Sequence, residues 1–451
     1  MPKDQNGSPV FGLLPLLPIL SVNFVGTLGF SIVLPFMVFL VAKWGGNAII
    51  FGALASTYSA FQLIGAPFLG RWSDRIGRRR VLLISQLGTL LSWVIFLAAF
   101  FLPADALFEV DSGILGQFTL TLPLVILFAA RAADGLTGGN VSVANAYLAD
   151  ITDEEHRAEN FGRMAMSTNA GFILGPALAG ILGATIYGEV LPVIAALLIS
   201  VFAALLIAFG LKESRQQLLD YKPGMPNACK IFGQETKEGY KLSGCDETPA
   251  GDIMKIPQMP AMLAVNFLVM LGFSFFYVAF PTHSAIGLDW TVTDTGTFFA
   301  FLSLLMVLVQ GPLLSALSKW VPDKTLVVTG SLILGGGFAL LIWNQWAFVY
   351  SAGALIALGN GLMWPTFMAM LSKQAGDQLQ GAVQGLASSM GAAASIAGLI
   401  GGGLLYTWVG SWVFVFSAVT ILITAALTTV ISRQIAPPST FSAKSKSDGK
   451  S

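Results

Sequence analysis

The sequence predicts an all-α membrane protein whose twelve transmembrane helices form two pseudo-symmetric halves of six helices each. Three observations support this fold class: the composition, a series of long apolar segments, and one long polar link in the middle of that series. Of the 451 residues, 55% are hydrophobic and only 11% are charged, whereas about a quarter of the residues in a soluble domain are charged. The chain is therefore expected to lie in a lipid bilayer.

The apolar segments are each long enough to cross a hydrocarbon layer of about 30 Å. In chain order they cover residues 12–41, 49–70, 81–102, 121–149, 161–187, 190–211, 259–282, 295–318, 324–343, 346–371, 383–407 and 411–432. We therefore expect an N-terminal half at 1–211, a central cytoplasmic loop at 212–258, a C-terminal half at 259–432 and a cytoplasmic tail at 433–451. The tail is polar and rich in Ser, Lys and Pro, a composition typical of disorder.

Positive charge predicts the orientation, because cytoplasmic loops carry an excess of Lys and Arg. With the N-terminus inside, 22 of the 24 lysines and arginines fall on cytoplasmic segments or at the cytoplasmic ends of spans, Arg131 falls deep within a span and only Lys43 faces outward. Both termini are therefore expected in the cytoplasm. The first span is too long for a signal-peptide core and lacks a strongly basic start, so no cleaved leader is expected. Cys229 and Cys245 lie on the reducing side and fit no metal-site spacing.

The link between the second and third spans is unusually basic. Its sequence, GRWSDRIGRRR, contains five arginines and one carboxylate, Asp74, and is too short to fold alone. Gly70 and Gly77 bracket the turn, where the absence of a side chain allows positive φ and close helix approach. The charges therefore belong to a tight turn at a membrane surface.

These residues carry a resemblance to a known family. The run from Gly70 to Arg80 resembles the signature loop of the major facilitator superfamily, in sequence and in its place between spans. RAADGLTGG, from Arg131 to Gly139, is similar to the fourth-span motif of that superfamily. GFILGPALAGILG is similar to the fifth-span motif of exporters that exchange a solute for protons, with Gly171, Gly175, Pro176 and Gly180 at the motif positions. Residues 146–162 also resemble tetracycline-type and multidrug proton antiporters, and the likeness is weaker in the second half.

The resemblance implies the major facilitator fold and a proton-coupled antiporter of the bacterial inner membrane that exports lipophilic or amphipathic small molecules by alternating access. Its partners are then a small-molecule substrate, protons and the bilayer, with no nucleic acid, cofactor or metal, and we expect a monomer. It also implies that the cytoplasmic side is gated by residues of the signature loop, namely Gly70, Asp74, Arg75, Gly77 and Arg78.

Two other functions stay open on the same fold: a proton-coupled importer of a small metabolite, and a non-transporting sensor or assembly protein. An enzyme is not expected, because the sequence offers no cluster of nucleophile, base and orienting residue, no set of metal ligands and no nucleotide-binding loop. The absence of that loop from the sequence also argues against a primary pump.

Asp134 is the only one of the 24 acidic residues inside a predicted span, and Arg131 is the only base that lies away from the span ends. Three positions apart on a helix, they share a face. Each charge deep in lipid costs about 2.5–3.5 kcal/mol even on the lenient insertion scale, so this face must meet water or another helix. Asp134 is the candidate for carrying the coupled proton, with Arg131 setting its proton affinity. The alternative is a buried structural pair that fixes helix packing.

The resemblance also implies that spans one, four, seven and ten line a central cavity. The candidate lining residues are Asn23, Thr27, Asn145, Asn266, Tyr277, Asn360 and Trp364. Apolar walls with a few polar groups suit lipophilic or amphipathic solutes, and ordinary helix packing is the alternative for each residue. Such exporters often carry a carboxylate in the first span, whereas this chain has only Asn23 and Thr27 there.

An acidic run follows the fourth span, on the same side as the arginines of the signature loop. It consists of Asp150, Asp153, Glu154, Glu155 and Glu159. The run is either a solvated cluster or a clasp that pairs with those arginines when the cytoplasmic side closes, each exposed pair contributing at most about 1 kcal/mol.

Overall fold

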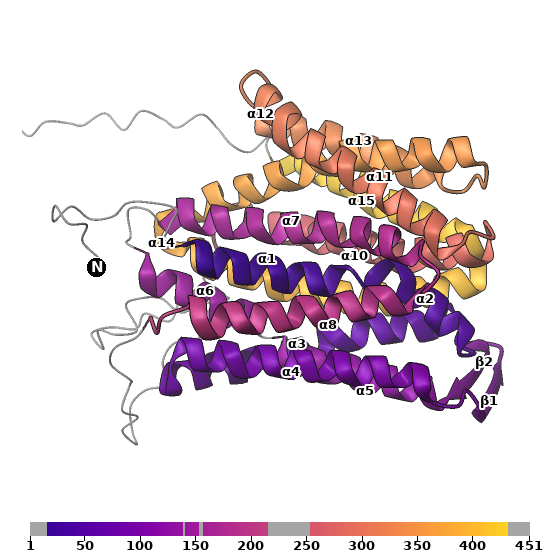
Figure 1. The fold of residues 1–451 in the computed structure, drawn as a ribbon. Helices are drawn as coiled ribbons and strands as arrows, with labels where there is room; N and C mark the ends of the chain where they lie inside the picture. The colour runs from indigo at the N-terminus through magenta and orange to yellow at the C-terminus, as the bar shows by residue number, and fades with distance from the viewer. Residues whose placement is uncertain (1–15, 139, 153–156, 215–252, 432–451) are drawn as a thin grey trace, which may run out of the picture.

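The computed structural model describes residues 16–138, 140–152, 157–214 and 253–431, and all elements and contacts of the structure named here lie within these residues. Long helices run side by side through the whole molecule (Figure 1). One end of the bundle carries the turn that precedes Arg78 and is called the Arg78 end. The opposite end carries a β-hairpin and is called the hairpin end; it lies on the right in Figure 1.

The first half contains eight helices in place of the six expected spans, because two spans are interrupted. The helices are α1 Leu17–Ser31, α2 Leu34–Lys43, α3 Ala48–Ile76, α4 Arg78–Ala98, α5 Leu122–Thr137, α6 Asn140–Ile151, α7 Arg157–Gly183 and α8 Val190–Leu205. The first span divides before Pro35, which lies in the first turn of α2, where its missing N–H needs no helical partner. The fourth span divides next to Gly138, the C-cap of α5.

The second half comprises α10 Met259–Ile286, α11 Val292–Leu308, the short π-helical segment Val309–Leu313, α12 Leu314–Leu317, α13 Asp323–Leu340, α14 Trp346–Val409 and α15 Val413–Ile431. The 64 residues of α14 cover both the tenth and the eleventh expected spans. A straight helix of that length would measure about 96 Å, three times the bilayer core. The α14 helix must therefore fold back on itself.

The packing of α14 shows where it reverses direction. A Cβ on Gly330 would meet Gly359 and one on Gly337 would meet Ile356, so the first leg of α14 runs antiparallel to α13. The second leg runs parallel to α10, because Asn266 bonds the Ala387 carbonyl and Gly402 lies against Phe275. The polar segment between residues 374 and 386 keeps helical backbone geometry, where the sequence suggested a separating loop.

Nine described helices are long and apolar enough to cross a membrane. Hydropathy does not select the fourth span, which contains two charges and is broken, nor α13, which begins with Asp323 and Lys324. It also runs the eleventh and twelfth spans together as Leu386–Val430. Each of the twelve expected segments is nevertheless helical over most of its length. The chain is a multi-pass, all-α membrane protein.

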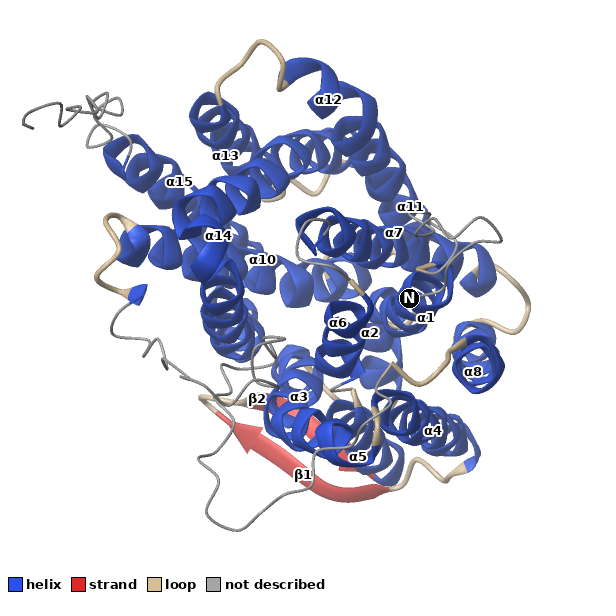
Figure 2. Ribbon diagram, turned by 90° about the vertical axis from the view of Figure 1, so that its left-hand side faces the viewer, coloured by secondary structure: helices blue, strands red, loops and turns tan. Residues whose placement is uncertain are grey.

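A two-stranded antiparallel sheet lies between the third and fourth spans and was not expected from the sequence. Its strands are β1 Ala106–Ser112 and β2 Gly116–Thr121, with Asp111 paired to Gln117 and Ser112 to Gly116. Figure 2 shows the hairpin beside α3 and α5.

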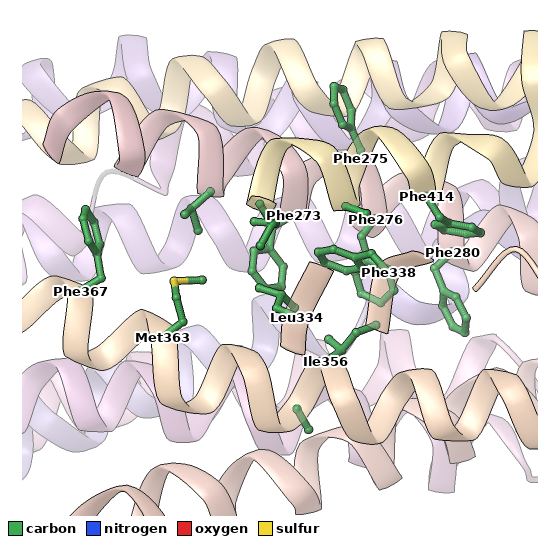
Figure 3. Packing of buried hydrophobic residues seen from close by; sticks show 14 of the residues in the cluster. Phe273, Phe275, Phe276, Phe280, Leu334, Phe338, Ile356, Met363, Phe367 and Phe414 are labelled. Atoms are coloured by element: carbon green, nitrogen blue, oxygen red, sulfur yellow. The ribbon is translucent and has the colours of Figure 1, made fainter. Parts of the chain in front are cut away.

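Each half has its own hydrophobic core. In the second half, rings of α10 and α13 meet directly: Phe338 lies 5.5 Å from Phe273 and 5.3 Å from Phe276, between ring centroids (Figure 3). Two further clusters of buried side chains are built mainly from α1 to α8. The expected boundaries at 211, 258 and 432 stay predictions, since residues 215–252 and 432–451 lie outside the described part of the chain.

Candidate functional site

Arg131 and Asp134 lie one turn apart on α5 and are both buried, with 2% and 5% of their surfaces exposed. The Arg131 Nη1 group donates to Asp134 Oδ2 at 3.2 Å. The two charges predicted to share a helix face are therefore in direct contact, and the face meets neighbouring helices.

Two aromatic rings cover the guanidinium group of Arg131. Its central carbon lies 4.8 Å from the ring centroid of Tyr58 on α3 and 5.2 Å from that of Phe30 on α1. The two rings are 4.5 Å apart, so they form one continuous surface beneath the cation. Cation–π attraction of this kind is strongest where water is excluded. Helices α1, α3 and α5 thus meet at one charged pair.

This arrangement can gain or lose a proton while the cation stays in place. Asp134 is tied to Arg131 by one hydrogen bond, and the Arg131 Nε atom has no hydrogen-bond partner within the described residues. If Asp134 takes up a proton, the ion pair is lost, but the rings of Phe30 and Tyr58 still hold the guanidinium. The same contacts also suit a purely structural pair, and measuring proton-driven transport separates the two interpretations.

At the Arg78 end, the signature loop is a compact hydrogen-bonded turn. Gly77 joins α3 to α4 with φ +102°, a backbone conformation that favours glycine. Arg78 is fully buried: Nη1 donates to Ser73 Oγ at 2.5 Å and Nε to Asp150 Oδ2 at 3.1 Å. Ser73 in turn donates to the Gly70 carbonyl at 2.6 Å. Of the predicted gating residues, Gly70, Gly77 and Arg78 are thus joined in one network.

The structure gives less detail for the other two predicted gating residues, Arg75 and Asp74. The Arg75 side chain is exposed on the last turn of α3, and the Asp74 side chain lies outside the described part of the structure. Within the acidic run, Asp150 is the partner of Arg78 in the first half. Asp153, Glu154, Glu155 and Glu159 have no described side chains, so the clasp formed by this run stays a prediction.

Glu213, at the start of the central link, packs against the turn between α3 and α4. The sequence interpretation missed this residue. Its Oε1 atom accepts the backbone N–H of Arg78 at 2.7 Å and that of Arg79 at 3.3 Å. A carboxylate at this place stabilises the positive end of the helix dipole of α4. The signal was faint, because an acidic residue 135 positions away forms no local motif with the loop. Ser214 adds a hydrogen bond to Asp150 at 3.0 Å, which holds the start of the central link here.

Three of the predicted cavity residues are engaged in helix contacts. The Asn23 amide donates to Thr168 Oγ1 on α7 at 2.7 Å, and the Asn266 amide donates to the Ala387 carbonyl on α14 at 2.8 Å. The Thr27 hydroxyl bonds back to the Asn23 carbonyl at 2.8 Å. The polar atoms of Asn23 and Asn266 join helices, as the packing alternative describes, whereas the Thr27 bond lies within α1.

The other four predicted cavity residues keep accessible surface. Tyr277 is 45% exposed, and Asn145, Asn360 and Trp364 are partly exposed. Among the described residues, the polar side-chain groups of Asn145, Tyr277 and Asn360 have no hydrogen-bond partner. Neighbours on the same stripes, Phe273, Phe280, Met363 and Phe367, are buried in the core of the second half (Figure 3). Each stripe therefore splits into a packed face and an accessible one.

The glycine motif of the fifth span contacts both halves. Gly171 and Gly175 lie against α1, where a Cβ would collide with Thr27 and Ser31. Nearer the hairpin end, a Cβ on Gly180 would lie 2.5–2.8 Å from the backbone of Gly296 on α11. Pro176 lies within α7 between these two contacts. Small residues allow such close approach of helix backbones.

A second close contact joins the halves at the hairpin end, between α3 and α14. A Cβ on Gly403 would lie 2.6 Å from the Ala48 carbonyl, and one on Gly52 would collide with the Leu399 carbonyl. Both glycines lie near the hairpin ends of their helices. Together with the contact between Gly180 and Gly296, they bring the two halves to backbone contact at this end.

Comparisons with known proteins agree with this architecture. The family model described as Major Facilitator Superfamily matches residues 19–398 and, in a second match, 262–451. The chain is 31% identical to "Tetracycline resistance protein, class G" of Vibrio anguillarum over 382 residues, which covers 83% of the chain and 86% of the relative. It is 25% identical to "Multidrug resistance protein 2" of Bacillus subtilis (strain 168) over 422 residues, 91% of the chain and 94% of the relative.

Solved structures show the same fold. A D-xylose-proton symporter superimposes with a TM-score of 0.68 at 12% identity, covering 92% of this chain and 97% of the symporter. The human organic anion transporter MFSD10 (TETRAN) superimposes with a TM-score of 0.63 at 19% identity, covering 93% of this chain and all of that one.

Proposed function

The chain belongs to the Major Facilitator Superfamily, and from this premise we propose that it is a proton-coupled antiporter exporting lipophilic or amphipathic small molecules by alternating access. The observation that carries the proposal is the buried pair of Arg131 and Asp134, in a chain whose relatives over most of its length are tetracycline and multidrug resistance proteins. Intramembrane ionisable residues mark ion pathways by default.

We assign the coupled proton to Asp134. It is the only acid inside a predicted span, so the chain has no second intramembrane carboxylate to carry the proton. Arg131 favours the ionised form of its neighbour, and burial disfavours it. The proton therefore binds when the pair is reached from the acidic side and leaves on the other side, with the cation held by Phe30 and Tyr58 throughout.

The accessible residues suit a lipophilic substrate. Tyr277 and Trp364 offer aromatic surface, and Asn145 and Asn360 offer polar groups that are free to orient a ligand. Apolar walls bind such solutes by burial, while isolated polar groups set their orientation. The energy is sufficient: one proton crossing about 150 mV supplies about 3.5 kcal/mol, which supports a gradient of a few hundredfold.

Placement in the membrane follows from the same premise. We propose a bacterial inner-membrane protein with both termini in the cytoplasm, because positively charged loops then face inward. The Arg78 end is then cytoplasmic and the hairpin end is exterior. We further propose that the chain acts as a monomer without cofactor and is not an enzyme.

Reconstitution into proteoliposomes with an imposed pH gradient tests the proposal. Tetracycline is the first probe, followed by a panel of lipophilic cations and neutral amphiphiles. We expect uphill movement of at least one probe opposite to the proton flow, and no uphill movement without the gradient. Movement in the same direction as the protons indicates an importer. Binding of probes without any flux indicates a sensor.

A further inference from the structure

The β-hairpin is built onto the first half of the molecule. The Thr119 N–H donates to the Gly45 carbonyl at 2.8 Å, in the turn between the first two spans. Asn47 donates from Nδ2 to the Leu115 carbonyl at 2.8 Å, while its Oδ1 atom caps the first turn of α3. The hairpin and the start of α3 are therefore one rigid unit.

The tip of the hairpin reaches the second half. The indole Nε1 of Trp408, at the end of α14, donates to the Ile114 carbonyl at 3.1 Å. Beside it, Thr407 Cγ2 lies 3.1 Å from the position that a Cβ on Gly116 would occupy. Two adjacent residues of α14 thus contact the tip of the hairpin, at Ile114 and at the first residue of β2.

This contact extends the interface between α3 and α14. Ala48, which is only 4% exposed, has its carbonyl against Gly403, one turn of α14 before Thr407. In a transporter that works by alternating access, the two halves separate at one end in each cycle. Separation of α3 from α14 at the hairpin end also pulls the hairpin tip away from Trp408, because the hairpin is fixed to α3.

We propose that the hairpin is a latch between the two halves: its tip holds α14 when the hairpin end is closed and releases Trp408 when that end opens. The proposal goes beyond the transport activity and rests on it only for alternating access. One exposed hydrogen bond favours the closed form by a factor of about two to twelve. Such a latch biases the equilibrium without preventing opening.

Thiol labelling tests the latch without any substrate. All variants carry C229S and C245S, and A48C provides a single thiol beneath the latch. A membrane-impermeant maleimide added from the hairpin side reaches this thiol only when the halves separate there. Substituting Trp408→Phe removes the N–H donor and keeps a ring, so we expect labelling about two- to twelvefold faster. The matched control W412F alters an exposed ring that makes no hydrogen bond to the hairpin within the described residues, and it is expected to leave the rate unchanged. Equal rates for W408F and its parent overturn the proposal.

A disulfide across the same contact gives a second test. In the C229S/C245S background, the G116C/T407C pair is within disulfide reach. When oxidised, it is expected to abolish uphill flux and retain substrate binding, and a reductant restores the flux. The D111C/Q117C pair joins the two strands within the hairpin and is the control, expected to transport equally when oxidised or reduced. Failure of the cross-half bond to form, or full transport with it formed, overturns the latch. If no variant transports any probe, the proposed function fails and the labelling rates still decide the latch.

Discussion

At the scale of single residues, the proposed proton coupling is concentrated in Asp134. Replacing it with Asn leaves a hydrogen-bonding side chain beside Arg131 but removes the exchangeable proton, so we expect uphill flux driven by a pH gradient to be lost. Substrate exchange without a gradient should survive, because the accessible residues Tyr277 and Trp364 are unaltered. Proton-driven uptake and substrate counterflow are measured in the same proteoliposomes.

Asp111→Asn is the matched control for that experiment, because it removes a carboxylate from the hairpin, where the side chain bonds Gln117 at 3.0 Å outside the membrane-spanning helices. It is expected to transport normally. Continued accumulation of substrate against a gradient by the D134N variant would show that the pair of Arg131 and Asp134 is structural.

Gly77 offers a prediction about stability. An alanine there must adopt φ near +102°, and its Cβ would lie 2.5–3.2 Å from the Glu213 carboxyl group. Gly77 has φ 102° and ψ 150°, a region that is essentially restricted to glycine. Forcing another residue into it costs about 1–3 kcal/mol, so Gly77→Ala should lower the melting temperature measured in detergent. Adding Glu213→Ala removes the collision and the helix cap together. We therefore expect non-additive effects in the double variant.

Gly113→Ala is the reference for the Gly77 series, since nothing lies within 4 Å of its Cβ position. It should leave the melting temperature unchanged. Strictly additive losses for G77A and E213A would mean that Glu213 and Gly77 do not interact.

At the scale of elements, long apolar segments could be predicted because crossing lipid demands length and internal backbone hydrogen bonding. Which face of each helix packs could not be predicted, because lipid and protein core are equally apolar and leave no amphipathic pattern. Tyr277 and Phe273 lie on one predicted stripe, yet only Phe273 is buried. The continuity of α14 was missed because polar residues between two spans resemble a loop, and the contacts of Glu213 depend on residues far away in the chain.

The contact between α7 and α11 yields a prediction at this scale. Gly180→Ala places a methyl group against the backbone of Gly296, and neither backbone can move aside without separating the helices. We expect the hairpin end to close less completely and uphill transport to fall, with labelling of A48C from that side increased. Gly336→Ala, on α13 with nothing within 4 Å, is the control for a helical glycine. Normal transport by G180A would mean that this contact is not needed for closure.

At the scale of the whole molecule, the halves meet through their backbones at the hairpin end, at Gly180 with Gly296 and at Gly403 with Ala48. The accessible residues Asn360 and Trp364 lie in the first leg of α14, nearer the Arg78 end than these contacts. The described conformation is therefore closed at the hairpin end, and the proposed substrate residues should be reached from the Arg78 end.

Labelling of Asn360→Cys, in the C229S/C245S background, tests this conformation. An impermeant maleimide should react faster from the Arg78 side than from the hairpin side, because the glycine contacts and the latch shield the latter route. A transported probe should protect the thiol, since Asn360 has an accessible side chain in the proposed cavity. Phe338→Cys, fully buried in the core of the second half, is the control and should stay unlabelled from both sides. Faster labelling of N360C from the hairpin side would contradict the assignment. If the probe protects the thiol but the labelling rates from the two sides are equal, the probe binds at Asn360 in a molecule that opens equally often at its two ends.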